Sequence, residues 1–235
     1  MARNDFLIPE SQEVWRHLEV AALRSHRDAG RVFDDFLSVT VCALSGGQME
    51  DQYLEIVKSY NGTKKSQRAV DTFPIAFAEL VYAMEKTRRD ILGDIFQGAI
   101  THGGNGQFFT PESVCELMAC MTTDPEAKSV IDPSCGSGRL LLASAEANPY
   151  AELLGWDIDP RCVRMTAINL ALRNRYGWAV HGNSLTEEKW QIYRTGFNGR
   201  GVIAEVALPK CPEPVKRIVR QIQEVRYTGR QLSLF

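Results

Sequence analysis

Residues 130–138, with the sequence Val-Ile-Asp-Pro-Ser-Cys-Gly-Ser-Gly, carry the clearest sign of chemistry in the chain. Gly136 and Gly138 follow a short apolar run, and glycines directly after a strand let the backbone approach a ligand closely. The helix expected after them presents backbone N–H groups at its start. Asp157 ends the next apolar run, 19 residues after Gly138, where a carboxylate can accept hydrogen bonds from ribose hydroxyls. The pattern therefore predicts a site for a cofactor that contains a nucleoside.

Glycine patterns of this kind also occur in nicotinamide-binding domains and in tight turns that bind nothing. Two features favour a cofactor with an amino-acid part. Asp132 and Pro133 precede the glycines, so the Asp132 carboxylate can face an ammonium group. Residues 106–111, Gly-Gln-Phe-Phe-Thr-Pro, lie just upstream, and a nicotinamide-dependent oxidoreductase leaves them unexplained.

Four motifs occur in a fixed order, and together they resemble a known family. They are Gly-Gln-Phe-Phe-Thr-Pro at 106–111, Asp-Pro-Ser-Cys-Gly-Ser-Gly at 132–138, Gly-Trp-Asp-Ile-Asp-Pro at 155–160 and Gly-Asn-Ser-Leu at 182–185. The set is similar to the N-6 adenine DNA methylase family, whose best-known members are the modification subunits of type I restriction-modification systems. The resemblance implies an α/β fold of the Rossmann-like methyltransferase type, with a partial parallel sheet, and S-adenosyl-L-methionine as the cofactor.

The resemblance also implies which positions contact the cofactor. The implied set is Phe108, Phe109, Thr110, Asp132, Pro133, Cys135, Gly136, Gly138, Asp157, Ile158 and Asn183. The first three would flank the methionine part, and the residues from 132 to 138 would line the amino-acid moiety. Asp157 would hold the ribose hydroxyls, Ile158 would lie against the adenine, and Asn183 would bond the adenine edge, where many relatives have aspartate.

Each of these residues also has a purely structural interpretation. Phe108 and Phe109 are also compatible with a role as core aromatics, Asp157 with a helix-capping carboxylate, and Asn183 with a turn residue. The ordered set of motifs favours the cofactor site over these alternatives.

The family's catalytic turn is missing from this sequence. The resemblance implies an Asn/Asp-Pro-Pro-Tyr/Phe turn after the fourth strand, which holds the exocyclic amine of a flipped adenine. No such tetrapeptide occurs, and residues 204–210 read Ala-Glu-Val-Ala-Leu-Pro-Lys instead. No catalytic residue is assigned, and we expect a truncated or degenerate member that is impaired in, or lacks, methyl transfer by itself. The alternative is that a partner chain, a complementing methylase or specificity subunit, supplies the missing half.

The segments that must position these motifs follow from hydrophobic periodicity. Residues 1–97 are expected to form a helical N-terminal domain, with apolar stripes that begin at Val14, Val32 and Ile75. The third stripe is expected to bury Ile75, Phe77, Ala78, Val81, Tyr82 and Met84. Residues 98–210 are expected to form the S-adenosylmethionine-binding domain, because apolar runs at 129–132, 153–157, 178–180 and 201–206 alternate with helical segments, as in a parallel sheet.

Residues 211–235 are expected to form a basic helix and a tail. Val215, Ile218, Val219 and Ile222 make an apolar stripe, with several lysines and arginines off it. The last five residues, Gln231 to Phe235, resemble the peptide by which bacterial DNA-processing proteins dock on the replication sliding clamp. The alternative is an apolar end that folds back on its own domain. The rival to a cofactor-binding protein is therefore a non-catalytic interaction module for DNA-bound machinery.

Composition excludes several classes of protein. The net charge is −2, so the whole chain is not a basic nucleic-acid binder, although DNA remains an expected partner through local basic patches. No apolar run approaches the ~20 residues of a membrane helix, and the N-terminus lacks a secretory signal, so a cytoplasmic protein without a membrane partner is expected. The six cysteines and four histidines show no metal spacing, which predicts no metal site and free, mostly buried thiols.

Overall fold

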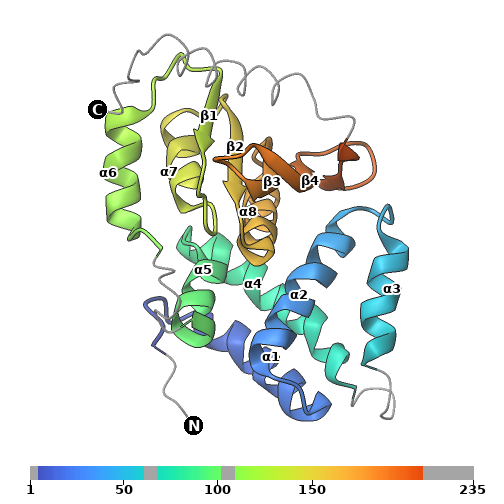
Figure 1. Ribbon diagram of the computed structural model, residues 1–235. Helices are drawn as coiled ribbons and strands as arrows, with labels where there is room; N and C mark the ends of the chain where they lie inside the picture. Colours follow the sequence, from blue (N-terminus) through green and yellow to red (C-terminus); the bar gives the residue numbers. More distant parts are fainter. Residues whose placement is uncertain (1–4, 61–67, 102–108, 209–235) are drawn as a thin grey trace.

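The computed structural model describes residues 5–60, 68–101 and 109–208. Its N-terminal part is helical, as the sequence predicts, and packs beneath the sheet in Figure 1. The elements of this part are α1 (Ser11–Ser25), α2 (Ala29–Leu44), α3 (Glu50–Ser59), the 3-10 turn η1 (Ala69–Thr72), α4 (Phe73–Thr87), α5 (Ile91–Ile95) and the π-helical turn η2 (Phe96–Thr101).

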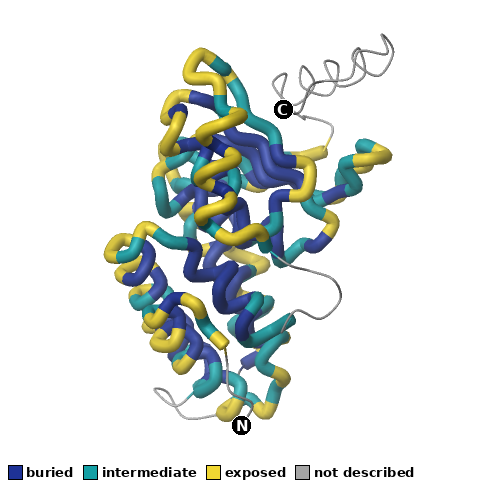
Figure 2. Tube along the Cα trace, turned by 90° about the vertical axis from the view of Figure 1, so that its left-hand side faces the viewer, coloured by how far each residue is buried: buried dark blue, intermediate teal, exposed yellow. Residues whose placement is uncertain are grey.

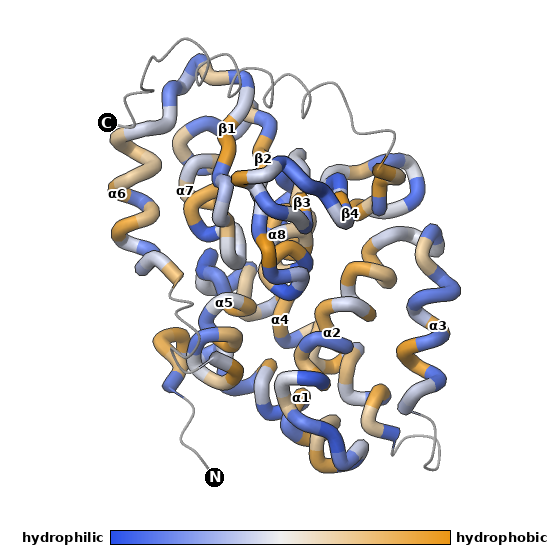
Figure 3. Tube along the Cα trace, viewed as in Figure 1, coloured by the Kyte–Doolittle hydropathy of each residue, from blue (hydrophilic) through white to orange (hydrophobic). Residues whose placement is uncertain are grey.

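Helix α2 shows how the sequence specifies this part. The Asp28 side chain accepts hydrogen bonds from the N–H groups of Gly30 and Arg31, which caps the first turn. The apolar stripe that includes Val32 and Phe33 is fully buried, as expected. In Figure 3, α2 is markedly more apolar than α3, which buries none of its residues. Helix α2 therefore lies at the centre of the helical part and α3 at its surface.

Of the third predicted stripe, on α4, only Met84 is buried. Ile75 is 47 % exposed and Tyr82 is 60 % exposed, and Val81 is also exposed. The buried side of α4 consists of Phe73, Ala76, Leu80, Ala83 and Met84. Because α4 is apolar around most of its circumference, periodicity alone does not select the inward face. Packing against α1 and η1 selects it.

The second part contains a five-stranded mixed sheet in the order β1-β2-β3-β4-β5. Its strands are β1 (Ser129–Asp132), β2 (Glu152–Asp157), β3 (Gly177–Asn183), β4 (Glu188–Thr195) and β5 (Ile203–Glu205), and its helices are α6 (Glu112–Thr122), α7 (Arg139–Ala147) and α8 (Pro160–Leu172). Strands β1, β2 and β3 are parallel, whereas β4 is antiparallel to both β3 and β5. The α/β class and the partial parallel sheet are confirmed.

One expected strand has a different place from the one predicted. Residues 201–206 were expected to continue the parallel series, but β5 pairs with β4, a strand that the sequence interpretation missed. Strand β4 returns from β3 through a turn in which Asn183 Oδ1 accepts hydrogen bonds from the N–H groups of Leu185 and Thr186. A short turn without a helix forces β4 to run antiparallel to β3. Because β5 pairs with β4, it lies at the opposite edge of the sheet from β1.

The helices α7 and α8 cover one face of the sheet. A side chain at Gly155 would point to that face, because a Cβ built there would lie 2.9 Å from Leu141 of α7. The neighbouring residues on the strands therefore face the opposite side, where a separate apolar cluster lies. The cluster consists of Leu154, Trp156, Trp178, Val180 and Ile192. In Figure 2 the strands form a continuous buried layer.

A single apolar core joins the helical part to the helix-covered face of the sheet. Phe33 and Phe96 from the helical part belong to the same cluster of buried residues as Val163 and Ile168 of α8. The helical part therefore packs directly against the helix that follows Asp157. Four of the five described cysteines are buried and all five are free, as expected. Within the described ranges, no helix is long and apolar enough to cross a membrane.

Candidate functional site

The glycine-rich loop connects β1 to α7 and takes a shape that requires glycine. Gly136 has φ 55° and Gly138 has φ 87°, values that residues with a side chain rarely adopt. A Cβ on Gly136 would also lie 2.9 Å from the Phe109 ring, and one on Gly138 would lie 3.1 Å from the Thr166 hydroxyl. The loop is thus closely packed against Phe109 and Thr166. Because its glycines have no side chains, a ligand can approach the loop backbone closely.

Parallel pairing brings the two predicted carboxylates to the same edge of the sheet. Asp132 ends β1 and Asp157 ends β2, and the strands are direct neighbours. The Asp157 carboxylate accepts hydrogen bonds from the N–H of Gly136 at 2.9 Å and from the N–H of Asp159 at 2.9 Å. The Asp132 carboxylate accepts from the N–H of Ser134 at 3.1 Å. Asp157 is therefore bonded directly to the loop that Asp132 begins.

The electrostatics show that both carboxylates occupy a common, poorly solvated region. Burial raises the pKa of Asp132, and the negative charge of Asp157 raises it further, while the Ser134 N–H acts in the opposite direction. Burial also raises the pKa of Asp157, against the effect of the hydrogen bonds that it accepts. Two like charges at one edge of a sheet favour a ligand that brings positive charge or hydroxyl donors between them.

Three further predicted residues occupy the rim of this region. Ile158, next to Asp157, is 63 % exposed. Asn183 ends β3 at the same edge, and its Oδ1 is engaged in the β3–β4 turn, so its interpretation as a turn residue also fits. The Thr110 carbonyl accepts a hydrogen bond from Arg139 Nη1 at 3.3 Å, which fixes the segment before α6 against the start of α7.

Phe109 packs as a core aromatic and at the same time touches the glycine-rich loop. Its ring stacks on Phe96 with a centroid separation of 5.6 Å, and the Arg139 guanidinium lies 5.6 Å from its centroid. The Cδ1 and Cε1 atoms of the ring lie against Gly136. Both interpretations of Phe109 are thus compatible with its position. Phe108 lies outside the described residues.

The side chain of Cys135 packs against α8 and β2. The thiol is buried beside the Thr166 hydroxyl, 3.4 Å away, and near the Cα of Gly155. Burial raises the pKa of this thiol well above its ordinary value. The Cys135 N–H donates to the Trp156 carbonyl at 2.8 Å, which ties the loop to the end of β2. Pro133 is exposed at the start of the loop.

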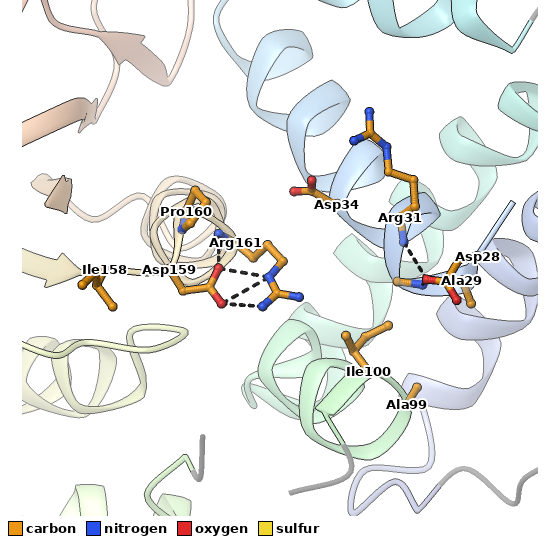
Figure 4. A pocket seen from close by; sticks show the side chains of 11 residues that line it. Asp28, Ala29, Arg31, Asp34, Ala99, Ile100, Ile158, Asp159, Pro160 and Arg161 are labelled. Atoms are coloured by element: carbon orange, nitrogen blue, oxygen red, sulfur yellow. Dashed lines mark hydrogen bonds and ion pairs between the residues drawn. The ribbon is translucent and has the colours of Figure 1, made fainter. Parts of the chain in front are cut away.

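A hollow of about 910 Å³ borders the site on the side of the helical part. It lies between the first turn of α2, the end of η2 and the start of α8, and Figure 4 shows Ile158 at one side of it, facing Ile100 across the hollow. The Asp159–Arg161 ion pair lines its middle. The segment that directly follows β2, from Ile158 to Arg161, thus lines a hollow that the helical part completes.

Sequence reasoning missed the polar side chains that hold the loop from beneath. Ser137 and Arg139 of the loop and of α7 both bond to Asp90, which precedes α5. Asn169 of α8 bonds to the same carboxylate. These residues lie 47 to 79 positions from Asp90 in the chain, so no local pattern relates them. Within the described residues, no cluster of His, Cys, Asp or Glu side chains is suited to a metal ion.

Comparison with known proteins identifies related sequences. The family profile described as N-6 DNA Methylase matches residues 87–204, half of the chain. The type I restriction enzyme MjaIX methylase subunit of Methanocaldococcus jannaschii is 29 % identical over 127 residues, which are 48 % of this chain and 23 % of that protein. The type II methyltransferase M.XamI of Xanthomonas campestris pv. amaranthicola is 26 % identical over 145 residues, 56 % of this chain and 24 % of that protein.

A third relative matches a longer stretch. The type I restriction enzyme MpnII methylase subunit of Mycoplasma pneumoniae is 24 % identical over 186 residues, 68 % of this chain and 34 % of that protein. The matches therefore span only about a quarter to a third of these curated relatives.

Proposed function

Because the chain belongs to the N-6 DNA methylase family, we propose that the loop at residues 133–138 and the carboxylates of Asp132 and Asp157 form its S-adenosylmethionine site. The family has the methyltransferase fold, and S-adenosylmethionine is its methyl donor. The observation that carries the proposal is the placement of a buried carboxylate, Asp132, and a half-buried one, Asp157, on neighbouring strand ends, with the Gly136 N–H bonded to Asp157.

The chemistry of this donor set fits the cofactor. One carboxylate, Asp132, faces the ammonium group of the methionine part, and the other, Asp157, accepts from the ribose hydroxyls. Each oxygen of Asp157 already accepts one backbone N–H and retains a second lone pair for a hydroxyl. The exposed side chain of Ile158 offers apolar surface to the adenine. The Asn183 amide can donate a hydrogen bond from Nδ2 to the adenine edge. The remaining residues of the proposed site shape the loop around the methionine part: Phe109, Thr110, Pro133, Cys135 and Gly138. Phe108 stays in the proposed site on the sequence motif alone.

We further propose that the described part of the chain does not transfer methyl groups by itself. The resemblance predicts a catalytic turn in the segment after β5. In the sheet, β5 lies four strands from β1, which at ~4.8 Å per strand separates this segment from Asp132 by about 19 Å. The side chains of Ala207 and Leu208 carry no polar group that can accept from an adenine amine. Incorporation of tritiated methyl groups from S-adenosylmethionine into unmethylated DNA is therefore expected to remain at background.

The same assay separates this proposal from its alternatives. Robust incorporation at adenine by the chain alone would show that the absence of the catalytic turn has been misinterpreted. Incorporation only after addition of a type I methylase or specificity subunit would favour the alternative that a partner completes the enzyme. The exposed Leu117 and Met121 lie on α6, the helix that faces the viewer in Figure 2, and β1 is an edge strand of the sheet in the described residues; both provide surface for such a partner.

A second candidate function is an interaction module for DNA-bound machinery. It depends on the basic segment at 211–235 and on the clamp-like peptide Gln231 to Phe235, which lie outside the described residues. Deletion of the last five residues is expected to remove capture of the chain on an immobilised bacterial sliding clamp, while a Gln48→Ala variant at the surface of the helical part binds as the unmodified chain does. Equal capture with and without the peptide would eliminate the docking role.

A further inference from the structure

Asp90 is a buried carboxylate that links the helical part to the glycine-rich loop. It is 2 % exposed and caps the short helix α5 by accepting from the Gly93 N–H at 2.9 Å. Its other donors come from the second part of the chain: the Ser137 hydroxyl, Arg139 Nε at 2.8 Å and Asn169 Nδ2 at 2.8 Å. Four donors use the full accepting capacity of a carboxylate.

Ser137, between the two loop glycines, is held by this network at both its side chain and its backbone. Its hydroxyl donates to Asp90, and its carbonyl accepts from Asn169 Nδ2 at 2.8 Å. Asn169 is fully buried, and its Oδ1 has no partner among the described residues. The two acceptors, Asp90 and the Ser137 carbonyl, set the orientation of the amide, because its nitrogen can donate to both and its oxygen cannot. The cost is a buried amide oxygen without a described partner.

The first turn of α5 is closed tightly over the same contact. A Cβ on Gly93 would lie 2.0 Å from Asp90 Oδ2 and 2.5 Å from Ser137 Oγ, so only glycine fits there. The Asp90–Arg139 ion pair is almost completely buried, with side-chain exposures of 1 % and 8 %. The loop is thereby held from the helical part through Ser137 and from β2 through the bond between Gly136 and Asp157.

We propose that Asp90 is a positioning residue for cofactor binding, which fixes the glycine-rich loop through Ser137 without touching the cofactor. This inference rests on the proposed S-adenosylmethionine site. It also gives the helical part a role in that site, because the loop conformation depends on a carboxylate that precedes α5. Without the link, Gly136 is less well placed to bond Asp157. Ligand binding must then order the loop, and the lost entropy lowers the affinity.

The test uses the full chain and S-adenosylhomocysteine, titrated by calorimetry into four proteins: unmodified, Ser137→Ala, Asp90→Asn and the double variant. Removal of a buried hydrogen bond to a charged group corresponds to about a ten-fold weaker affinity or more, and we expect that loss for Ser137→Ala. Asp90→Asn weakens binding at least as much. Because both substitutions break one link, the double variant should lose no more than Asp90→Asn alone.

Asp35 supplies a matched control, because it is a buried carboxylate with a similar role elsewhere. It is 4 % exposed and bonds Tyr60, Arg27 and Arg31 within the helical part. Asp35→Asn should lower the melting temperature, as Asp90→Asn does, but leave the affinity for S-adenosylhomocysteine unchanged at a temperature where every variant is folded. A loss of affinity in Asp35→Asn equal to that in Asp90→Asn would reduce the Asp90 effect to general destabilisation and overturn the inference.

A readout without ligand separates this inference from the proposed function. Amide hydrogen exchange of residues 134–142 should be faster in Ser137→Ala and Asp90→Asn than in the unmodified and Asp35→Asn proteins. If the unmodified chain fails to bind S-adenosylhomocysteine, the proposed function fails, and exchange alone decides whether Asp90 positions the loop. Unchanged exchange of the loop, or unchanged affinity in Ser137→Ala, overturns the positioning role. Ser137→Ala keeps the Asp90–Arg139 pair, so the test survives if Asp90→Asn does not fold.

Discussion

Replacement of Asp157 by alanine is expected to abolish detectable binding of both S-adenosylmethionine and S-adenosylhomocysteine. The carboxylate holds the Gly136 and Asp159 N–H groups and, in the proposed complex, the ribose hydroxyls. Loss of two hydrogen bonds to a charged acceptor corresponds to an affinity decrease of at least about 100-fold. Isothermal titration of the full chain with each ligand measures this decrease directly.

The control for this variant is Asp124→Ala. Asp124 is an exposed residue in the α6–β1 connection whose side chain accepts from the Glu126 N–H in a turn. It should bind both ligands as the unmodified chain does. Titration with NAD completes the comparison, since a glycine-rich loop alone also suits a dinucleotide. Preferential binding of NAD by the unmodified chain, or undiminished binding of S-adenosylhomocysteine by Asp157→Ala, would contradict the assigned site.

The substitution Asp132→Asn is expected to abolish most of the cofactor affinity while making the unliganded protein more stable at neutral pH. Asparagine keeps an acceptor for the Ser134 N–H but removes a charge that burial and Asp157 both disfavour. An ammonium group bound in the cofactor site loses its counter-charge in this variant, which corresponds to an affinity decrease of about ten-fold or more. A residue that lowers stability and supports binding is typical of a functional site.

The pH dependence of this effect has a definite sign. The pKa of Asp132 is higher in the folded protein than in the unfolded chain, so the folded state binds more protons between the two values. The unmodified protein therefore loses stability as the pH rises through that range, and Asp132→Asn, in which only the raised pKa of Asp157 remains, loses less. Thermal melts from acidic to neutral pH should show a melting-temperature advantage of the variant that is absent at the acid end and grows as the carboxyl ionises.

Two results would contradict the assignment of Asp132. One is a lower melting temperature of Asp132→Asn at pH 7, which would indicate that the carboxylate stabilises the fold. The other is unchanged affinity for S-adenosylhomocysteine, which would place the ammonium group elsewhere. Asp71→Asn serves as a control for the melts, because Asp71 forms a partly exposed pair with Arg68 in η1, far along the chain from the loop.

The structure confirms the predictions that depended on local sequence. Helices in the N-terminal part, the strand before the glycine-rich loop and the strand that ends at Asp157 are all present. Parallel pairing of β1 with β2 follows from the helix between them, so the two carboxylates meet at one edge as expected. The family, its fold and its cofactor are confirmed by the match over residues 87–204. The domain boundaries and the cofactor-binding residues remain predictions.

The errors have physical reasons that particular residues illustrate. In β4, Trp190 and Ile192 alternate with polar residues, which is a strand signal, but the charged run before them resembles a loop. On α4, Ile75 and Tyr82 match the helical period as well as the residues that are in fact buried. Local patterns specify that an element forms, and they leave open which neighbour it pairs with or which of two apolar faces turns inward.

The sequence by itself determined which residues are candidates for the proposed site, because glycines in tight loops and acidic residues at strand ends are short-range requirements that four motifs express in order. Only the tertiary structure decided what holds that site in place. The contact of Asp90 with Ser137 joins residues 47 positions apart, and the edge position of β5 depends on how β4 pairs. Such contacts follow from the packing of whole elements around one core, which no window of neighbouring residues encodes.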